Sequence, residues 1–148
     1  MEVQPDFREL LALFNAHKVK YLIVGGYALA FYGSPRATGD IDIFIQPVPA
    51  NAKRVHAALN QFGFGSVGLS ACDFEKSDRV IQLGVPPVRI DIMTSLTGVS
   101  WTAAYKNRVK GKYSDVPVFY LGRHQFLLNK RSIGRKKDQA DLEALAED

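Results

Sequence analysis

The sequence Tyr21-Leu22-Ile23-Val24-Gly25-Gly26 opens the segment that decides the fold of this chain. Four consecutive apolar residues, most of them good strand formers, predict a short strand that the two glycines end. Residues 27–32 then carry a helical pattern that stops at Gly33. The segment therefore predicts a strand, a glycine turn and a helix in direct succession.

A second strand with a different pattern follows at residues 40–45. Isoleucine alternates with Asp40, Asp42 and Phe44, which is the period of a half-buried strand, and Pro47 ends it. One face of this strand is apolar and the other carries two carboxylates.

The rest of the chain predicts helices and strands in mixed order. Helices are expected at residues 5–17, 51–62, 100–105, 124–133 and 138–146, and strands at residues 80–85, 88–93 and 116–121. The strands at 80–85 and 88–93 are joined through Pro86-Pro87, most simply as a hairpin. This order predicts an α+β (mixed α/β) fold, in which a mixed sheet of four or five strands packs against helices, two of them at the C-terminal end.

The composition is that of a soluble globular protein, with 148 residues, 47% of them hydrophobic and 23% charged. No repeat or long linker divides the chain, so we expect a single domain over residues 1–148. The single Cys72 excludes an internal disulfide and a cysteine-rich zinc site. No apolar run approaches the roughly 20 residues of a membrane span, and no signal peptide is visible. We expect a cytoplasmic protein with no membrane partner.

The formal charge of +4 suits a polyanionic partner such as a nucleotide or a nucleic acid. Much of the positive charge lies at residues 106–112 and 130–137. The alternative interpretation is that these residues belong to solvated helix ends and loops.

Asp40 and Asp42 carry the strongest chemical signal. Residues two apart on a strand point to the same side, with Cα atoms roughly 6.5 to 7 Å apart. Aspartate is a poor strand former, and burial of an unpaired charge is unfavourable. A cation held between the two carboxylates would relieve both costs.

Asp91 provides a third carboxylate in a strand of the same kind. If the two strands are neighbours, three carboxylates surround one site and match the oxygen ligands that Mg²⁺ prefers. Such a triad is able to hold two ions about 3.5 to 4 Å apart. The alternative role for Asp91 is an ion pair with Arg89 or with a nearby lysine.

Gly25-Gly26 lies where a strand passes into a helix. Glycine lets backbone N–H groups approach an anion, and the helix N-terminus favours negative charge, so a phosphate is able to bind there. The alternative is a tight turn that needs a positive φ. The segment is neither a P-loop nor a dinucleotide fingerprint, because the lysine of the first and the third glycine of the second are absent.

Together, residues 22–30, 36–43 and 89–92 resemble the DNA polymerase β-type nucleotidyltransferase superfamily. The sequence is most similar to its small bacterial members, namely the minimal nucleotidyltransferases, the AbiEii-like toxin-side enzymes and the lincosamide nucleotidyltransferases. The resemblance implies a nucleotidyltransferase fold, a triphosphate bound at Gly25 and Gly26, and transfer of a nucleoside monophosphate from an NTP such as ATP. It further implies that Asp40, Asp42 and Asp91 are the catalytic residues and hold two Mg²⁺ ions, for which Mn²⁺ is a substitute.

Basic and polar residues outside this core resemble those that approach the triphosphate in such enzymes. They are Lys130 and Lys137 in the C-terminal segment, and Arg36 and Thr38 before the aspartate strand. The alternatives are a solvated basic loop that precedes a capping Asp138, and a loop that orders the start of the strand.

The acceptor is left open by the sequence and includes a tRNA end, a protein hydroxyl and a small molecule. A cognate toxin or antitoxin partner is also implied by the resemblance. Two other functions are weighed against the enzyme: a non-catalytic module that binds a nucleotide or RNA, and a structural domain whose acids pair with surface cations. The aromatic residues Trp101, Tyr105, Phe119 and Tyr120 are able to stack on a base, but core packing is their commoner role.

Overall fold

The computed structural model describes residues 3–33 and 39–146. Within these residues the α-helices are α1 (Pro5–Ala16), α2 (Gly25–Phe31), α3 (Pro49–Leu59), α4 (Trp101–Lys106), α5 (Arg123–Ile133) and α6 (Lys136–Ala146). The strands are β1 (Tyr21–Val24), β2 (Asp40–Ile45), β3 (Val80–Leu83), β4 (Arg89–Met93), β5 (Val109–Tyr113) and β6 (Val116–Tyr120). A π-helical turn, η1 (Asn60–Phe64), and a 3₁₀ turn, η2 (Ala71–Phe74), follow α3.

All six of these strands form one mixed sheet in the order β3-β4-β2-β1-β6-β5. β2 pairs with β4, and β1 with β6, in parallel, whereas the pairs β1–β2, β3–β4 and β5–β6 are antiparallel. The predicted α+β class and the hairpin of β3 and β4 are confirmed.

The sheet has six strands, whereas the sequence predicted four or five. The additional strand is β5, which lies at the edge of the sheet and pairs there with β6. Its sequence alternates exposed Lys110 and Lys112 with residues that are less exposed, so it carries little apolar signal. Lysine is common on edge strands because it opposes pairing with another chain. The basic stretch thus forms a strand rather than a loop.

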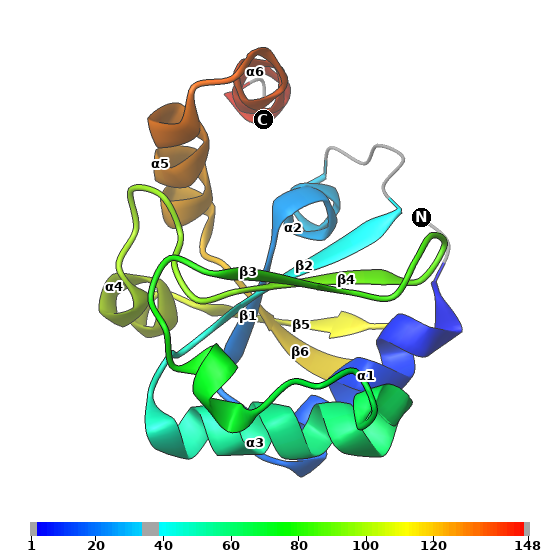
Figure 1. Ribbon diagram of the computed structural model, residues 1–148. Helices are drawn as coiled ribbons and strands as arrows, with labels where there is room; N and C mark the ends of the chain where they lie inside the picture. Colours follow the sequence, from blue (N-terminus) through cyan, green and yellow to red (C-terminus); the bar gives the residue numbers. More distant parts are fainter. Residues whose placement is uncertain (1–2, 34–38, 147–148) are drawn as a thin grey trace.

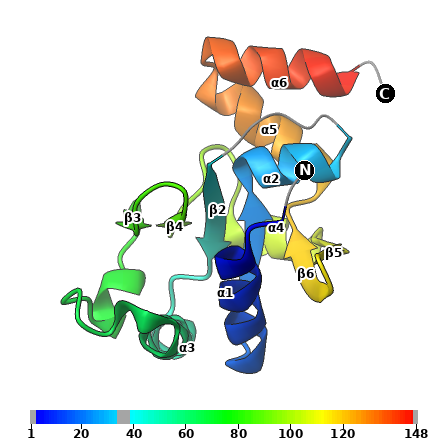
Figure 2. The same ribbon diagram turned by 90° about the vertical axis from the view of Figure 1, so that its right-hand side faces the viewer.

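The helices lie on two sides of the sheet. In the view of Figure 1, α1 and α3 lie below the sheet, and α2, α5 and α6 lie above it. Figure 2 shows that α5 and α6 stand together beyond α2, at the end of the molecule opposite α3. The apolar side of α1, with Phe7, Leu10, Leu11 and Phe14, is fully buried in the core.

Four helices, α2, α3, α5 and α6, begin earlier than the sequence predicted, α3 and α5 by one or two residues. α2 starts at Gly25 instead of residue 27, because both glycines form its first turn. α6 starts at Lys136, so Asp138 lies in its first turn and is not the capping residue.

The aromatic residues weighed as a base platform take part in packing. Trp101 meets Phe44 of β2 edge to face, with ring centroids 5.1 Å apart, and stacks on Tyr105. Tyr120 is buried and stacks on Phe31. Among the described residues, no helix is long and apolar enough to cross a bilayer.

Candidate active site

Parallel pairing of β2 and β4 brings the three aspartates together. Asp42 lies directly opposite Asp91, and Asp40 lies opposite Arg89. Because residues two apart on a strand share a face, Asp40, Asp42 and Asp91 project from the same face of the sheet. We call these three side chains the carboxylate cluster. The sequence left open whether the two strands are neighbours, and the structure makes them adjacent.

Arg89 lies within the carboxylate cluster and pairs with two of its members. Its Nε is 3.3 Å from Asp91 Oδ1, and its Nη2 is 3.4 Å from Asp91 Oδ2. The same Nε is 3.6 Å from Asp40 Oδ2. The ion pair between Arg89 and Asp91, which was the alternative role for Asp91, is therefore formed.

Asp42 carries a strongly perturbed carboxyl group. Burial raises its pKa to about 7, together with the charge and hydrogen bond of Asp91 and the charge of Asp40, whereas the charge of Lys130 opposes this rise. A pKa raised in this way reports excess negative charge in a poorly solvated position, and a bound cation would relieve it.

Gly25 passes beside the Asp42 side chain. β1 ends at Val24, which pairs with Asp42. The next residue, Gly25, therefore lies close to the Asp42 carboxylate. Gly25 has a φ of +65°. A Cβ atom on this residue would overlap Asp42 Oδ2 and lie 3.0 Å from Asp42 Cγ. The position therefore requires glycine both for its left-handed backbone and for the space that Asp42 occupies.

Replacing Gly25 with alanine is expected to lower the free energy of unfolding by about 3 kcal/mol, since left-handed strain and steric overlap add together. The matched control is Gly68→Ala, because Gly68 also has a positive φ, +82°, but a Cβ there would meet nothing within 4 Å. The control should lose only about 1 to 2 kcal/mol. Urea denaturation of the two variants measures the difference, and equal losses would show that the contact with Asp42 does not matter.

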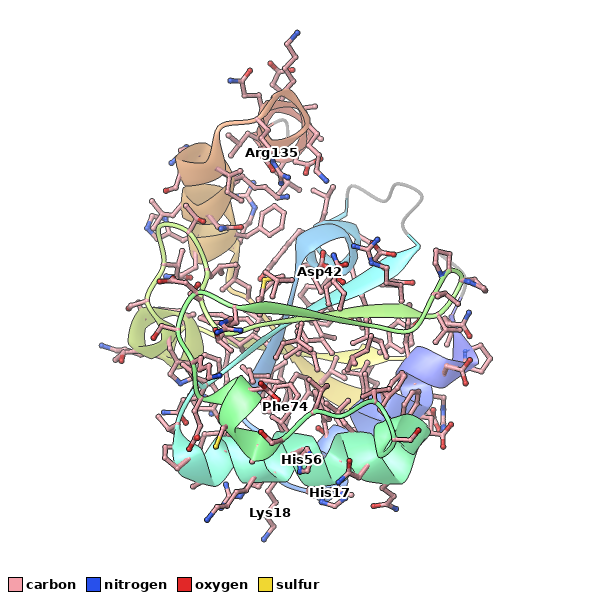
Figure 3. The ribbon with its side chains drawn as sticks, in the orientation of Figure 1. His17, Lys18, Asp42, His56, Phe74 and Arg135 are labelled. Carbon is pink, nitrogen blue, oxygen red and sulfur yellow. The ribbon has the colours of Figure 1, made fainter. Side chains whose placement is uncertain are left out.

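A cleft of about 440 Å³ opens beside the carboxylate cluster. Its lining combines glycines (Gly25, Gly26, Gly39), carboxylates (Asp40, Asp42), polar and basic residues (Asn129, Lys130, Arg135, Lys137) and apolar residues (Val24, Met93, Leu96, Ile133). Figure 3 shows Arg135 on the same side of the sheet as Asp42, whereas His17 and His56 lie on the opposite side. The cleft thus has an acidic wall, a basic wall and an apolar part.

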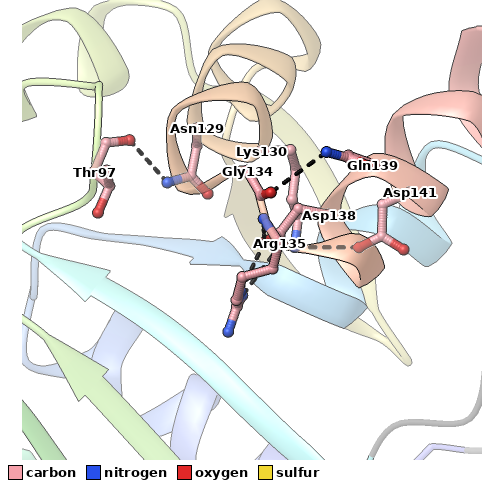
Figure 4. A network of polar contacts seen from close by, with 8 residues as sticks. All are labelled: Thr97, Asn129, Lys130, Gly134, Arg135, Asp138, Gln139 and Asp141. Atoms are coloured by element: carbon pink, nitrogen blue, oxygen red, sulfur yellow. Dashed lines mark hydrogen bonds and ion pairs between the residues drawn. The ribbon is translucent and has the colours of Figure 1, made fainter.

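The basic wall is fixed by a buried ionic network between α5 and α6 (Figure 4). Lys130 Nζ lies 3.2 Å from Asp138 Oδ1 and 3.2 Å from Asp141 Oδ2. Arg135 Nε lies 2.6 Å from Asp138 Oδ2, and the backbone N–H of Arg135 donates to the same oxygen. Burial alone would raise the pKa of Asp138, but the hydrogen bonds and charges of Arg135 and Lys130 outweigh it and lower the pKa to about 2.

The structure places the expected nucleotide-binding residues as follows. Gly25, Gly26, Lys130 and Lys137 line the cleft, but the ammonium group of Lys130 is engaged by Asp138 and Asp141. Lys137 is exposed on α6. The expected residues Arg36 and Thr38 lie outside the described residues.

Two arginines near the carboxylates were missed as site residues. Arg135 lies in a basic stretch that the sequence did reveal, yet helical register decides which of its cations reaches the cleft. Arg89 was considered only as a partner of Asp91. Its position directly before Ile90-Asp91, on the same strand face as the acid, was the available signal.

The cluster suits a divalent cation by its chemistry but not by its present arrangement. Carboxylate oxygens are the ligands that Mg²⁺ prefers, and Asp42 and Asp91 are cross-strand neighbours. Over residues 3–33 and 39–146, however, no three His, Cys, Asp or Glu side chains are grouped so that they could hold a metal ion. Arg89 pairs with Asp40 and Asp91, so a guanidinium group contacts the oxygens of these two carboxylates.

Comparison with solved structures identifies the fold as that of nucleotidyltransferases. A nucleotidyltransferase candidate from Thermotoga maritima matches 99% of this chain and 96% of its own, with a TM-score of 0.62 and 15% identity. The lincosamide antibiotic adenylyltransferase LnuA with lincomycin bound matches 97% of this chain and 96% of its own, with a TM-score of 0.55 and 14% identity.

A third match is an antigenic nucleotidyltransferase-like protein from Paracoccidioides brasiliensis, which covers 95% of this chain and 72% of its own at a TM-score of 0.58 and 20% identity. These three matches confirm the nucleotidyltransferase fold that the sequence resemblance implied. No protein-family model and no curated protein sequence matches the chain.

Proposed function

We propose that this protein is a Mg²⁺-dependent nucleotidyltransferase that moves a nucleoside monophosphate from an NTP to an acceptor hydroxyl. One observation carries the proposal: the parallel register of β2 and β4 sets Asp42 beside Asp91, next to a cleft that Gly25 and Gly26 also line. The fold shared with nucleotidyltransferases supports the same reaction class.

Different residues of the cleft bind different parts of the nucleotide. Gly25 and Gly26 form the first turn of α2, where N–H groups lack partners within the helix, and they contact the triphosphate. Arg135, directly before α6, and Lys137 of α6 face it and balance its negative charge. The apolar lining at Met93, Leu96 and Ile133 accommodates the base.

The carboxylate cluster acts at the α-phosphorus of the bound NTP. Asp40, Asp42 and Asp91 would hold divalent cations, two at full occupancy, which supply charge neutralisation at the transferred phosphate. The acceptor oxygen forms a bond to the α-phosphorus as the bond to the β-phosphate oxygen breaks, and pyrophosphate leaves. Asp91 receives the hydroxyl proton. Catalysis consists mainly of positioning and electrostatic stabilisation.

The acceptor is a hydroxyl group of a tRNA end, a protein or a small molecule. The lincomycin-bound adenylyltransferase has the same fold, which supports testing small molecules alongside the two macromolecules. A cognate toxin or antitoxin partner belongs to the same proposal, since binding of such a partner would regulate access to the acceptor.

The proposal is tested by label transfer from each of the four NTPs, labelled at the α-phosphate, with Mg²⁺ present. Bulk tRNA, a protein mixture and lincomycin serve as acceptors. We expect wild-type protein to label one acceptor class and Asp40→Ala to lose this labelling. Equal labelling by both proteins would reject the proposal.

A second candidate function is a non-catalytic module that binds a nucleotide or RNA. The ion pairs of Arg89 with Asp40 and Asp91 favour it, because they satisfy the acids without metal. Binding of ATP or RNA that is undiminished in EDTA, without label transfer to any acceptor, would support this alternative.

A further inference from the structure

One guanidinium group spans the carboxylate cluster in this structure. Arg89 is two residues before Asp91 on β4 and directly opposite Asp40 on β2, so it shares their face of the sheet. It contacts Asp91 through both Nε and Nη2, at 3.3 and 3.4 Å, and reaches Asp40 Oδ2 at 3.6 Å. The first and third carboxylates are thereby connected by a single cation.

The oxygens that Arg89 contacts are those that a divalent cation needs. An arginine that donates to both oxygens of a carboxylate occupies lone pairs that would otherwise ligate a metal. Asp42 lies directly opposite Asp91 and completes the cluster.

The Arg89 side chain is also able to move away from the carboxylate cluster. Its side chain is 33% exposed and that of Asp40 is 34% exposed, in contrast to 10% for Asp91. Arginine does not lose its proton in proteins, so the competition ends only when the side chain moves. If the cluster is able to bind metal only in the fraction of molecules in which Arg89 has moved away, its apparent metal affinity is reduced by that fraction.

We propose that Arg89 is a resident counter-cation of the carboxylate cluster that competes with divalent metal, so that metal binding requires displacement of its side chain from Asp40 and Asp91. This inference rests on the proposed function, because it concerns the metal site of that reaction. Arg89 is a positioning residue: it connects Asp40 and Asp91 in the metal-free protein and sets the metal concentration at which the cluster becomes filled.

The test is Mn²⁺ binding to nucleotide-free protein, followed by the electron paramagnetic resonance signal of free Mn²⁺ at about pH 8, where exposed carboxyls are ionised. Removing the competing cation in Arg89→Met is expected to tighten Mn²⁺ binding about tenfold. Arg89→Lys keeps the positive charge but loses the bidentate contact with Asp91. Its Mn²⁺ affinity should therefore lie between those of wild type and Arg89→Met.

The matched control is Arg54→Met, since Arg54 is an exposed arginine of α3 on the other side of the sheet. It changes the net charge equally and should leave the Mn²⁺ affinity at the wild-type value. Thermal melting in EDTA verifies that each variant is folded. Mn²⁺ affinity that is unchanged or weaker in Arg89→Met, or raised equally by Arg54→Met, would overturn the inference.

Failure of the inference and failure of the proposed function give different results. If only the role of Arg89 is wrong, Mn²⁺ binds wild type and Arg89→Met alike, and label transfer still depends on Asp40. If the metal-dependent function is wrong, no variant binds Mn²⁺ and no acceptor is labelled.

Discussion

Replacing Asp42 with asparagine is expected to lower the rate of nucleotidyl transfer about 10³-fold while leaving the protein folded. Asp42 lines the cleft and lies opposite Asp91, so its carboxylate is the member of the cluster placed between the other two acids. Asparagine has nearly the same shape but no charge, and therefore removes the negative charge and one of the two oxygens that the proposal assigns to cation binding, without leaving a cavity. Label transfer from NTP under saturating Mg²⁺ measures the loss.

The stability of Asp42→Asn separates this effect from unfolding. Because burial and neighbouring acids disfavour the ionised form of Asp42, the neutral amide should not lower the free energy of unfolding in EDTA. Asp78→Asn is the matched control: Asp78 is exposed and has a positive φ, 56°, which asparagine tolerates. The control should retain full activity. Substantial activity in Asp42→Asn would contradict the assigned role.

Replacing Lys130 with methionine is expected to lower the free energy of unfolding by about 3 to 5 kcal/mol. The substitution keeps much of the apolar length of the side chain but leaves Asp138 and Asp141 buried without their shared cation. The side chains of Lys130, Asp138 and Asp141 are 6%, 0% and 4% exposed, so water cannot replace the lost contacts. Urea denaturation at neutral pH measures the loss.

Lys136→Met is the control for this prediction, because Lys136 is an exposed lysine of α6, the helix that carries Asp138 and Asp141. It should change stability by less than about 0.5 kcal/mol. A double variant, Lys130→Met with Asp141→Asn, also removes the charge of one of the two acids that lose Lys130, and it should recover part of the loss. Equal stability of Lys130→Met and wild type would show that the network does not hold α6 in place.

The effect of Lys130 should also depend on pH in a defined direction. The pKa of Asp138 is lowered to about 2, so its ionised form stabilises the fold above its unfolded pKa of about 3.9. This contribution is lost as the pH falls from about 4 towards 2, when the native carboxylate becomes protonated. The stability difference between wild type and Lys130→Met should therefore narrow over that interval.

Much of the fold was predictable because its signals are local. The apolar run at residues 21–24, the alternation at residues 40–45 and the helical spacing in α1 each report which face of an element is buried. β5 escaped prediction because its exposed lysines and its glycine carry no such signal, and only pairing with β6 defines it as a strand.

The three acids and the two glycines of the candidate site were visible in the sequence, but their arrangement and the two arginines near them were not. The sequence placed Asp40 and Asp42 on one strand face and singled out Asp91, because strand periodicity alone sets those directions. That Asp42 faces Asp91, and that Gly25 leaves room for the Asp42 carboxylate, depends on which strands pair and in what register.

The sequence by itself therefore determined the fold class, the acidic strand faces and the glycine pair, since each follows from short-range periodicity. The tertiary structure alone decided that Arg89 spans two of the acids, that Lys130 is buried against α6 and that Arg135 reaches the cleft. The physical reason is that an ionic partner is selected by distance in space. Residues 89 and 40, or 130 and 141, meet only after the strands pair and the helices pack.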